Sequence, residues 1–143
     1  MSWGSASNEA RRVLKNNVVP ALRKRGFAGS FPHFSRRRED RIDLLSFQFS
    51  KFGPDLYIEI ASGTPDGARL ADGSVISSTK MHTYHAGLFR RRIGPQPALD
   101  FSGVEDPVAA THFVNQVITA IDHQGEPWWS APTPMVVKAS NPS

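Results

Sequence analysis

No cysteine occurs among the 143 residues of this chain, which excludes disulfides, thiolate metal sites and a cysteine nucleophile. No apolar run is long enough to span a bilayer, and the first twelve residues lack the apolar segment of a secretory signal. We therefore expect a cytoplasmic protein without a membrane partner. The length suits one domain with one hydrophobic core.

Motifs for catalysis or nucleotide binding are also absent. The sequence contains no phosphate loop, no G-x-S-x-G turn and no dinucleotide fingerprint. His82 and His85 form an H-x-x-H pattern, but on a strand they would point to opposite faces, which is poor geometry for a metal. A third ligand would have to come from His33, His112 or a carboxylate. These patterns assign no catalytic residue, no cofactor and no metal site.

Positive charge is unevenly distributed along the chain. The formal net charge is +4, and residues 1–41 hold ten lysines and arginines against three acidic residues. The rest of the chain has more acidic than basic residues, although it contains Arg90, Arg91 and Arg92. Such asymmetry predicts an anionic partner: nucleic acid, phosphate or an acidic protein surface. Ordinary surface charge that keeps a small domain soluble is the alternative interpretation.

An N-terminal helix is expected over residues 8–25, where apolar side chains recur at helical spacing. Pro20 lies inside this pattern and should kink the helix or start a second short one. Gly26 is expected to close the helix in a left-handed conformation, and Phe27 to make the apolar contact that often follows.

A second helix is expected in the C-terminal part of the chain. Asp106 can cap its start, with Pro107 in the first helical position, and Gly125 should end it. Its apolar stripe consists of Ala110, Phe113, Val114, Val117, Ile118 and Ile121.

The stretch LLSFQFSKFGPDLYIEIASG, residues 44–63, has the alternation of a β-hairpin. Phe47, Phe49, Ile58 and Ile60 belong to the face that should be buried against the helices. Residues 52–55, Phe-Gly-Pro-Asp, are expected to form the loop. Phe49 would then lie opposite Ile58, and Phe47 opposite Ile60.

The other face of this hairpin is polar. Gln48 would lie opposite Glu59, and Ser50 opposite Tyr57. We expect this face to be solvated, as one face of an antiparallel sheet often is. It is also a candidate binding surface, and it could line an enzyme cleft together with the glycine-rich loop over residues 62–74.

Weaker strand patterns cover residues 31–37, 75–80, 82–93 and 99–101. Strands between two helices predict an α+β fold: one antiparallel sheet of four to five strands with an N-terminal and a C-terminal helix packed on one face. Residues 1–7 should be a flexible N-terminus, and residues 8–125 a single domain. Residues 126–143 should be a proline-rich tail, partly docked through Trp128 and Trp129.

Two arginine clusters are the strongest candidates for an anion or partner site. Alternation places Arg36 and Arg38 on one face of their strand, and Arg90 and Arg92 on one face of theirs. If the two strands were neighbours, four guanidiniums could share a surface and bind phosphate or carboxylate bidentately. The alternative interpretation is that these charges protect the edges of the sheet.

Short motifs in the first half of the chain resemble the bacterial domain-of-unknown-function family 4304. They are the Gly-Phe pair that ends the first helix, an aromatic residue followed by arginine, an FQ-S-K strand and a later glycine. Here these are Gly26, Phe27, Phe34, Arg36, Phe47, Gln48, Ser50, Lys51 and Gly63. The resemblance covers residues 10–125 and implies a small α+β domain, in the role of an immunity or accessory protein in bacterial conflict systems. It supplies no catalytic residues.

Three functional hypotheses follow from these observations. The first is a non-catalytic protein-binding module whose partner has an acidic surface, such as an immunity protein of a toxin system. The second is an anion or nucleic-acid binding protein that uses the two arginine clusters. The third is an enzyme with a site on the polar sheet face, lined by Gln48, Tyr57 and Glu59.

Overall fold

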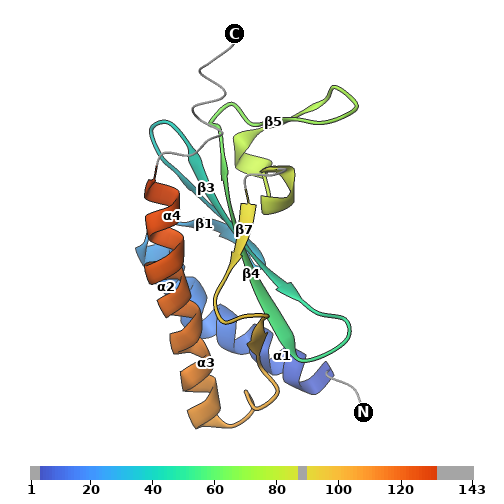
Figure 1. The fold of residues 1–143 in the computed structure, drawn as a ribbon, viewed down its shortest axis with the longest axis vertical. Coiled ribbons are helices and arrows are strands. Elements are labelled where there is room, and N and C mark those ends of the chain that lie inside the picture. The colour runs from blue at the N-terminus through green and yellow to red at the C-terminus, as the bar shows by residue number, and fades with distance from the viewer. Residues whose placement is uncertain (1–3, 87–89, 132–143) are drawn as a thin grey trace.

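The computed structural model describes residues 4–86 and 90–131, and Figure 1 shows the path of the chain. The N-terminal helix consists of α1 (Gly4–Val13), a π turn η1 (Leu14–Val18) and α2 (Val19–Lys24). Within the described residues the strands are β1 (Ala28–Ser30), β2 (His33–Arg37), β3 (Ile42–Phe49), β4 (Asp55–Gly63), β5 (Ala68–Arg69), β6 (Val75–Ile76), β7 (Arg90–Ile93) and β8 (Leu99–Asp100). The 3-10 helices η2 (Ser78–Lys80) and η3 (Thr83–Ala86) lie between β6 and β7. The C-terminal helix consists of α3 (Pro107–Ala120), a π turn η4 (Ile121–Gly125) and α4 (Glu126–Ser130).

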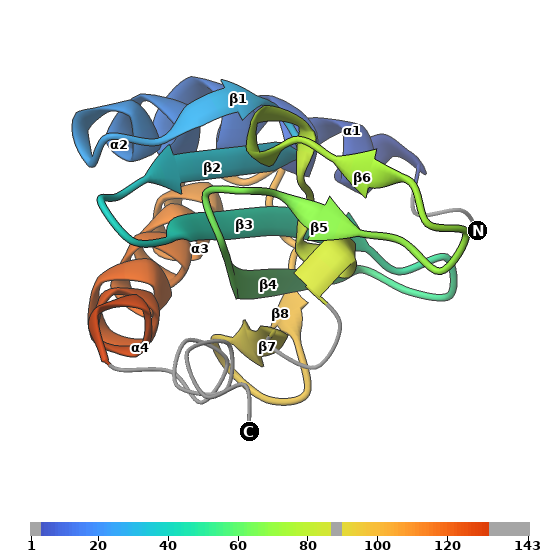
Figure 2. The ribbon, with the colours of Figure 1, turned by 90° about the horizontal axis from the view of Figure 1, so that it is seen from above.

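One antiparallel sheet forms the centre of the molecule. Its strands run in the order β1-β2-β3-β4-β7, and β8 pairs with β4 along the same edge as β7. Figure 2 shows this order from above. β5 and β6 form a separate two-stranded sheet. The predicted α+β fold is confirmed, and the main sheet has six strands in the part of the chain that the structure describes.

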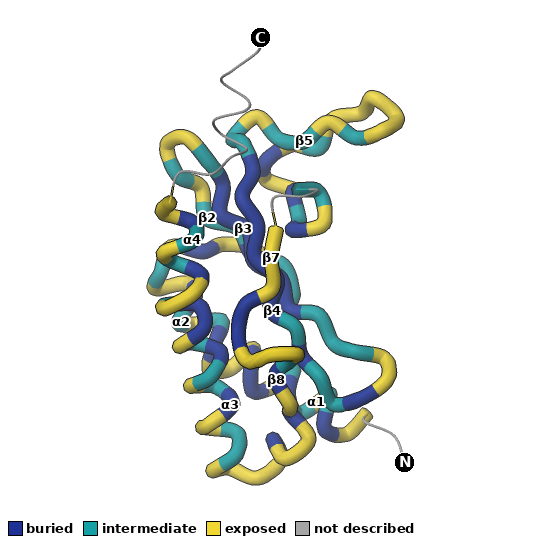
Figure 3. Tube along the Cα trace, viewed as in Figure 1, coloured by how far each residue is buried: buried dark blue, intermediate teal, exposed yellow. Residues whose placement is uncertain are grey.

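Both long helices pack on one face of the sheet, opposite η2 and η3 (Figure 1). The predicted core contacts are confirmed, because the expected helix and strand residues belong to one buried cluster, with Phe49 packed at its border. The central strands β3 and β4 are dark blue, and therefore buried, over most of their length in Figure 3. The cluster includes Leu14, Leu22, Phe47, Ile58, Ile60, Phe113, Val117 and Ile121.

Pro20 is accommodated in the N-terminal helix by the π turn that precedes it. The N–H of Val19 donates to the carbonyl of Leu14, five residues earlier, so the turn is wider than an α-helical one. Proline has no N–H to donate, and of the two expected outcomes the structure has the second, because a short helix, α2, starts at Val19 with Pro20 in its first turn. The same arrangement recurs in the C-terminal helix, where the N–H of Glu126 donates to the carbonyl five residues earlier and Pro127 follows.

The boundaries of the N-terminal helix differ from the prediction only at its start. The helix begins at Gly4 rather than at residue 8, so residues 4–7 are helical. Its end is as predicted, because Gly26 has a positive φ of 91° and the N–H of Phe27 donates to the carbonyl of Leu22 at 3.0 Å.

The C-terminal helix does not end at Gly125 but continues to Ser130. A Cβ atom at Gly125 would lie 3.0 Å from the ring of Trp129, so the absence of a side chain lets this ring pack against the helix. Trp129 is fully buried and donates its indole N–H to the carbonyl of Ala61 at 3.0 Å. Residues 126–130 of the predicted tail are therefore a packed helical segment. The remainder from residue 132 lies outside the described residues.

The central hairpin keeps the predicted faces but has a different register. Phe47 pairs with Ile58 and Phe49 with Leu56, rather than with Ile60 and Ile58. The loop holds four residues as predicted but lies one residue earlier, over residues 51–54, because the ladder closes where the N–H of Ser50 donates to the carbonyl of Asp55 at 2.9 Å. A shift of two residues leaves every side chain on its predicted face.

The expectation that the second face of the sheet is solvated is wrong. Residues 64–86, which include β5, β6, η2 and η3, lie over this face and form a second small core with Ile42, Leu44, Ala61 and Met81. Strands were predicted over residues 75–80 and 82–93, but among the described residues only β6 and β7 are strands there, and the 3-10 helices η2 and η3 lie between them. Glu59 is therefore buried under this cover together with Ser46, whereas Gln48, Ser50 and Tyr57, nearer the hairpin loop, are partly exposed. Of the helices within the described residues, none has the length and apolar character needed to cross a membrane.

Candidate functional site

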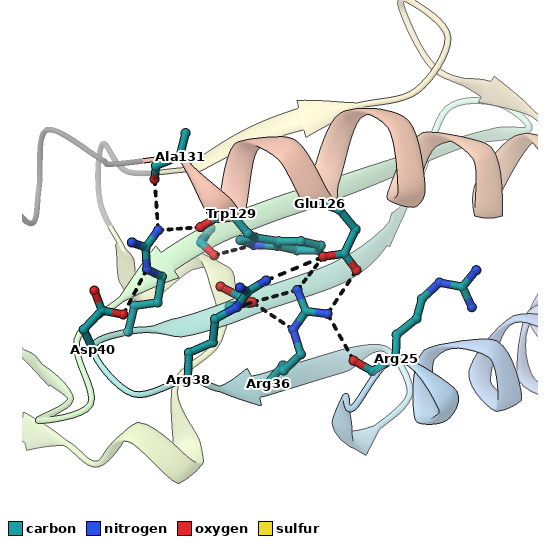
Figure 4. A network of polar contacts seen from close by, with 10 residues as sticks. Arg25, Arg36, Arg38, Asp40, Glu126, Trp129 and Ala131 are labelled. Carbon is teal, nitrogen blue, oxygen red and sulfur yellow. Dashed lines mark hydrogen bonds and ion pairs between the residues drawn. The ribbon is translucent and has the colours of Figure 1, made fainter.

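Arg36 and Arg38 lie in an ion-pair network between the sheet and the C-terminal helix (Figure 4). Both guanidiniums donate from Nε to one carboxylate oxygen of Asp43, at 2.8 and 2.6 Å. Arg36 also donates to both oxygens of Glu126, at 2.7 and 3.0 Å. Asp43 is fully buried, and its second oxygen has no hydrogen-bond partner among the described residues.

Every nitrogen of the Arg36 guanidinium has an acceptor within the molecule. Besides the two acids, it donates to the carbonyl of Arg25 at 3.0 Å. Its plane lies near the rings of Phe27 and Trp129, at 4.5 and 5.3 Å from their centroids. Arg36 therefore has no free donor for an external anion, and its role in this structure is to join β2, β3 and α4.

Other N-terminal basic residues are also used within the molecule. Arg41 donates to the carbonyls of Trp129 and Ala131, at the C-terminal end of α4 (Figure 4). Arg25 forms a bidentate pair with Asp122, with both distances at 2.8 Å. Much of the positive surplus of residues 1–41 thus holds helices to the sheet.

The second arginine cluster lies on the other face of the sheet and at its edge. Two strands, β3 and β4, separate β7 from β2, so the four predicted arginines do not share a surface. Arg90, Arg91 and Arg92 are all exposed, as the yellow start of β7 in Figure 3 shows. Arg92 stacks on Tyr57 at 4.0 Å, and Arg90 lies 3.9 Å from a carboxylate oxygen of Glu59.

A buried polar cluster occupies the covered face of the sheet. Glu59 on β4 accepts hydrogen bonds from Thr83 at 2.7 Å and from Gln48 at 3.2 Å, both on Oε1. The hydroxyl oxygens of Thr83 and Ser46 are 3.1 Å apart. Ser46 in turn lies 2.9 Å from Nδ1 of His33. A continuous chain of hydrogen bonds therefore runs from a buried carboxylate to an imidazole.

His33 connects this cluster to a group of aromatic rings from the covering segment. Its ring stacks on that of His82, with centroids 3.7 Å apart and an angle of 2° between the planes. His82 also contacts Tyr84, whose hydroxyl lies 3.2 Å from His82 Nδ1. His85 accepts a hydrogen bond on Nδ1 from the backbone N–H of His82 at 2.9 Å. The stacked pair joins β2 to the segment that covers the sheet.

Burial lowers the pKa of His33 below its ordinary value of 6.5, and the nearby His82 and His85 lower it further. Burial also lowers the pKa of His82, with a further contribution from His85. Both imidazoles are thus favoured in the neutral form by the fold.

The fold should lose stability as the pH falls below about 6.5, because both histidines bind protons more weakly in the folded than in the unfolded chain. Their contribution is present above the unfolded pKa and is lost as the pH falls through the folded pKa. Urea unfolding at about pH 7.5 and about pH 5 would measure this difference. The double variant His33→Asn/His82→Asn should show a smaller loss than the parent, whereas His112→Asn, on the exposed side of α3, should lose as much as the parent.

The described residues contain no group of three or more His, Asp or Glu side chains placed to hold a metal ion. His82 precedes the 3-10 helix η3 and His85 lies within it, rather than on a strand, and their ring centroids are 5.8 Å apart.

This geometry defines the class of the protein. It is a small α+β domain with two helices on one face of an antiparallel sheet and a covered polar cluster on the other face. Residues 18–131 match the family described as "Domain of unknown function (DUF4304)", and the chain belongs to this family. No curated protein and no solved structure matches the chain.

The structure brings together some of the sequence-predicted site residues and separates others. Gln48 and Glu59 contact each other in the polar cluster, whereas Tyr57 lies beside Arg92 at the edge. Ser46 and Thr83 were missed, and His33 was considered only as a third metal ligand. The sequence does indicate that Ser46 is a candidate for the polar cluster, because it is a polar residue between the buried Leu45 and Phe47.

Proposed function

We propose that the chain is a non-catalytic protein-binding module whose partner places an acidic segment along β7. The observation that supports this proposal is the edge position of three consecutive exposed arginines. β7 hydrogen-bonds to β4 on one side, and no described strand lies on its other side. An extended acidic segment could therefore add to the sheet through backbone hydrogen bonds and meet the guanidiniums with its carboxylates.

The contrast between the two arginine clusters supports β7 over β2 as the contact surface. The guanidinium of Arg36 already donates its hydrogen bonds to Asp43 and Glu126, so binding an external anion would break these buried ion pairs. Within the described residues, Arg91 and Arg92 form no ion pair, and Arg90 has only the distant contact with Glu59. Arginines on an exposed edge also keep identical sheets apart, which leaves the edge available to an acidic partner.

Reversing charge at β7 should weaken partner binding by at least about tenfold, since charge pairs at an interface commonly contribute more than 1.4 kcal/mol. The variant is Arg91→Glu/Arg92→Glu, and the partner is one captured from the native host with the parent chain. Lys24→Glu/Lys51→Glu is the matched control, because it makes the same charge change at two exposed positions outside β7. Equal affinity of the β7 variant and the control would contradict the proposal.

The same arginines could instead contact nucleic-acid phosphates, which predicts a different result. Single- and double-stranded oligonucleotides should then bind at low salt and dissociate steeply as salt rises. Binding of this kind, lost in Arg91→Glu/Arg92→Glu, would favour the nucleic-acid hypothesis over the protein partner. The specific case of an immunity protein would be supported if the captured partner is a toxin whose activity falls when the chain binds.

A further inference from the structure

A pocket of about 360 Å³ opens beside the stacked histidines, between β1–β2 and the segment around η2. Its polar lining consists of the imidazoles of His33 and His82 and the hydroxyls of Ser30, Ser35 and Thr79. Among the described residues, no acidic side chain lines it. The pocket therefore offers hydrogen-bond donors and titratable rings without a carboxylate that would repel an anion.

Arg37 is the cationic residue that shares a strand face with this lining. His33, Ser35 and Arg37 occupy alternate positions of β2 and so share one face of the strand. Arg37 reaches toward the same covering segment, where its Nη1 donates to the hydroxyl of Ser78 at 3.3 Å. Unlike Arg36, Arg37 has no ion pair among the described residues.

The hydrogen-bond chain behind His33 gives Nδ1 of the ring a partner. Thr83 has one hydroxyl hydrogen and lies 2.7 Å from the Glu59 carboxylate and 3.1 Å from the Ser46 hydroxyl. Ser46 lies 2.9 Å from Nδ1 of His33, and its hydroxyl can donate to the neutral ring or accept from the protonated ring. When the ring is protonated, Nδ1–H therefore has an acceptor, and Nε2–H is left for a ligand.

We propose that this pocket is a binding site for a small oxyanion, and that His33 takes up one proton from solvent when the anion binds. In the protonated ring, Nδ1–H donates to Ser46 while Nε2–H can donate to the anion. Glu59, at the far end of the hydrogen-bond chain, stabilises the positive charge. Because His33 and His82 stack at 3.7 Å, one proton for the pair is accommodated far more easily than two.

Several charged or titratable groups surround His33 and act on this equilibrium. The covering segment contributes His82, Tyr84 and His85, the sheet contributes Glu59 with Arg90 behind it, and β2 contributes Arg37. Burial and the neighbouring histidines favour the neutral ring before binding. An anion reverses this balance, and by reciprocity anion binding and protonation strengthen each other.

Sulfate and acetate are the probes, because neither changes its charge between about pH 6 and about pH 8. Histidine-ring NMR at these two pH values reports the tautomer and protonation of each imidazole while the anion is titrated. Sulfate should bind more tightly at the lower pH, by at most about tenfold per pH unit for uptake of one proton. Preference for sulfate would point to a phosphate-bearing ligand, and preference for acetate to a carboxylate-bearing one.

Three variants test the assignment of residues, each checked for folding by circular dichroism. His33→Asn removes the ring that takes up the proton and should abolish the pH dependence of binding, and Arg37→Gln should weaken binding at both pH values. His112→Asn, on the exposed surface of α3, should behave as the parent. The proposal is overturned if the His33 ring stays neutral when the anion binds at the lower pH, or if sulfate and acetate shift His112 as much as His33.

Discussion

Replacing Phe47 by alanine should lower the free energy of unfolding by about 3–5 kcal/mol, which is a large part of the roughly 5–15 kcal/mol expected for a whole domain. Phe47 is 3% exposed and pairs with Ile58 at the centre of the sheet. Its ring stacks on that of Phe31 at 5.7 Å and meets Phe34 edge-on at 6.1 Å. Truncation removes this apolar burial and leaves a cavity that neighbours on three strands cannot fill without moving.

A matched control lies in the same hairpin. Phe52 is the same residue type, but at 94% exposure it makes little apolar contact. Phe52→Ala should therefore change stability by no more than about 0.5 kcal/mol. Urea unfolding of both variants compares them directly, and the assignment of faces is wrong if Phe52→Ala is the more destabilising of the two.

Replacing Arg36 by alanine should cost about 3–5 kcal/mol, because it removes one of the two arginines that pair with the buried carboxylate of Asp43 and also breaks the ion pair with Glu126. The substitution also removes the hydrogen bonds to Glu126 and the contacts with the rings of Phe27 and Trp129. Arg12→Ala is the control, because the pair of Arg12 with Glu9 is exposed on α1 and should contribute less than about 1 kcal/mol.

A double-mutant cycle separates the ion pair from simple loss of packing. In Arg36→Ala/Asp43→Ala no buried carboxylate remains at position 43, so the double variant should lose less stability than the sum of the single variants. Additive losses would show that Arg36 acts mainly through its contacts with the aromatic rings and not through its charge.

The sequence was sufficient to predict the layers of this fold because local patterns determine them. Alternation in β3 and β4 identifies the buried face, and the stripe in α3 identifies the face that meets it. Asp106 caps α3 as predicted, with its carboxylate accepting from the N–H of Ala109 at 2.9 Å. Each of these features involves residues close together along the chain, whose spacing is visible in the sequence.

The features that could not be predicted are those for which the local sequence suits two alternatives, or for which the contact joins distant segments. The hairpin register depends on a loop that closes at Ser50 and Asp55, and the same turn residues suit a four-residue loop one position later equally well. The continuation of the C-terminal helix depends on Trp129 packing against Gly125, whereas glycine by itself indicates an end. The face expected in water is covered because residues 64–86 fold back over it.

The candidate site shows the same limit. The chain from Glu59 through Thr83 and Ser46 to His33 joins four segments, and none of these residues has a neighbour in sequence that indicates the others. The sequence indicates where the positively charged arginines are, but it does not indicate whether the fold places an acidic side chain beside each of them. Asp43 and Glu126 engage one cluster, and the order of strands places the other at an edge.

The π turns before Pro20 and Pro127 determine which side chains of each long helix face the sheet after the turn. A π turn holds one residue more than an α-helical path between the same two points, and each residue turns the helix by about 100°. Deleting a single residue from η1 would allow regular α-helical spacing, yet it would rotate Leu22 away from the core relative to Leu14. The length of each helix is therefore part of its fit to the sheet, and at these two turns a one-residue deletion is a larger change than most substitutions.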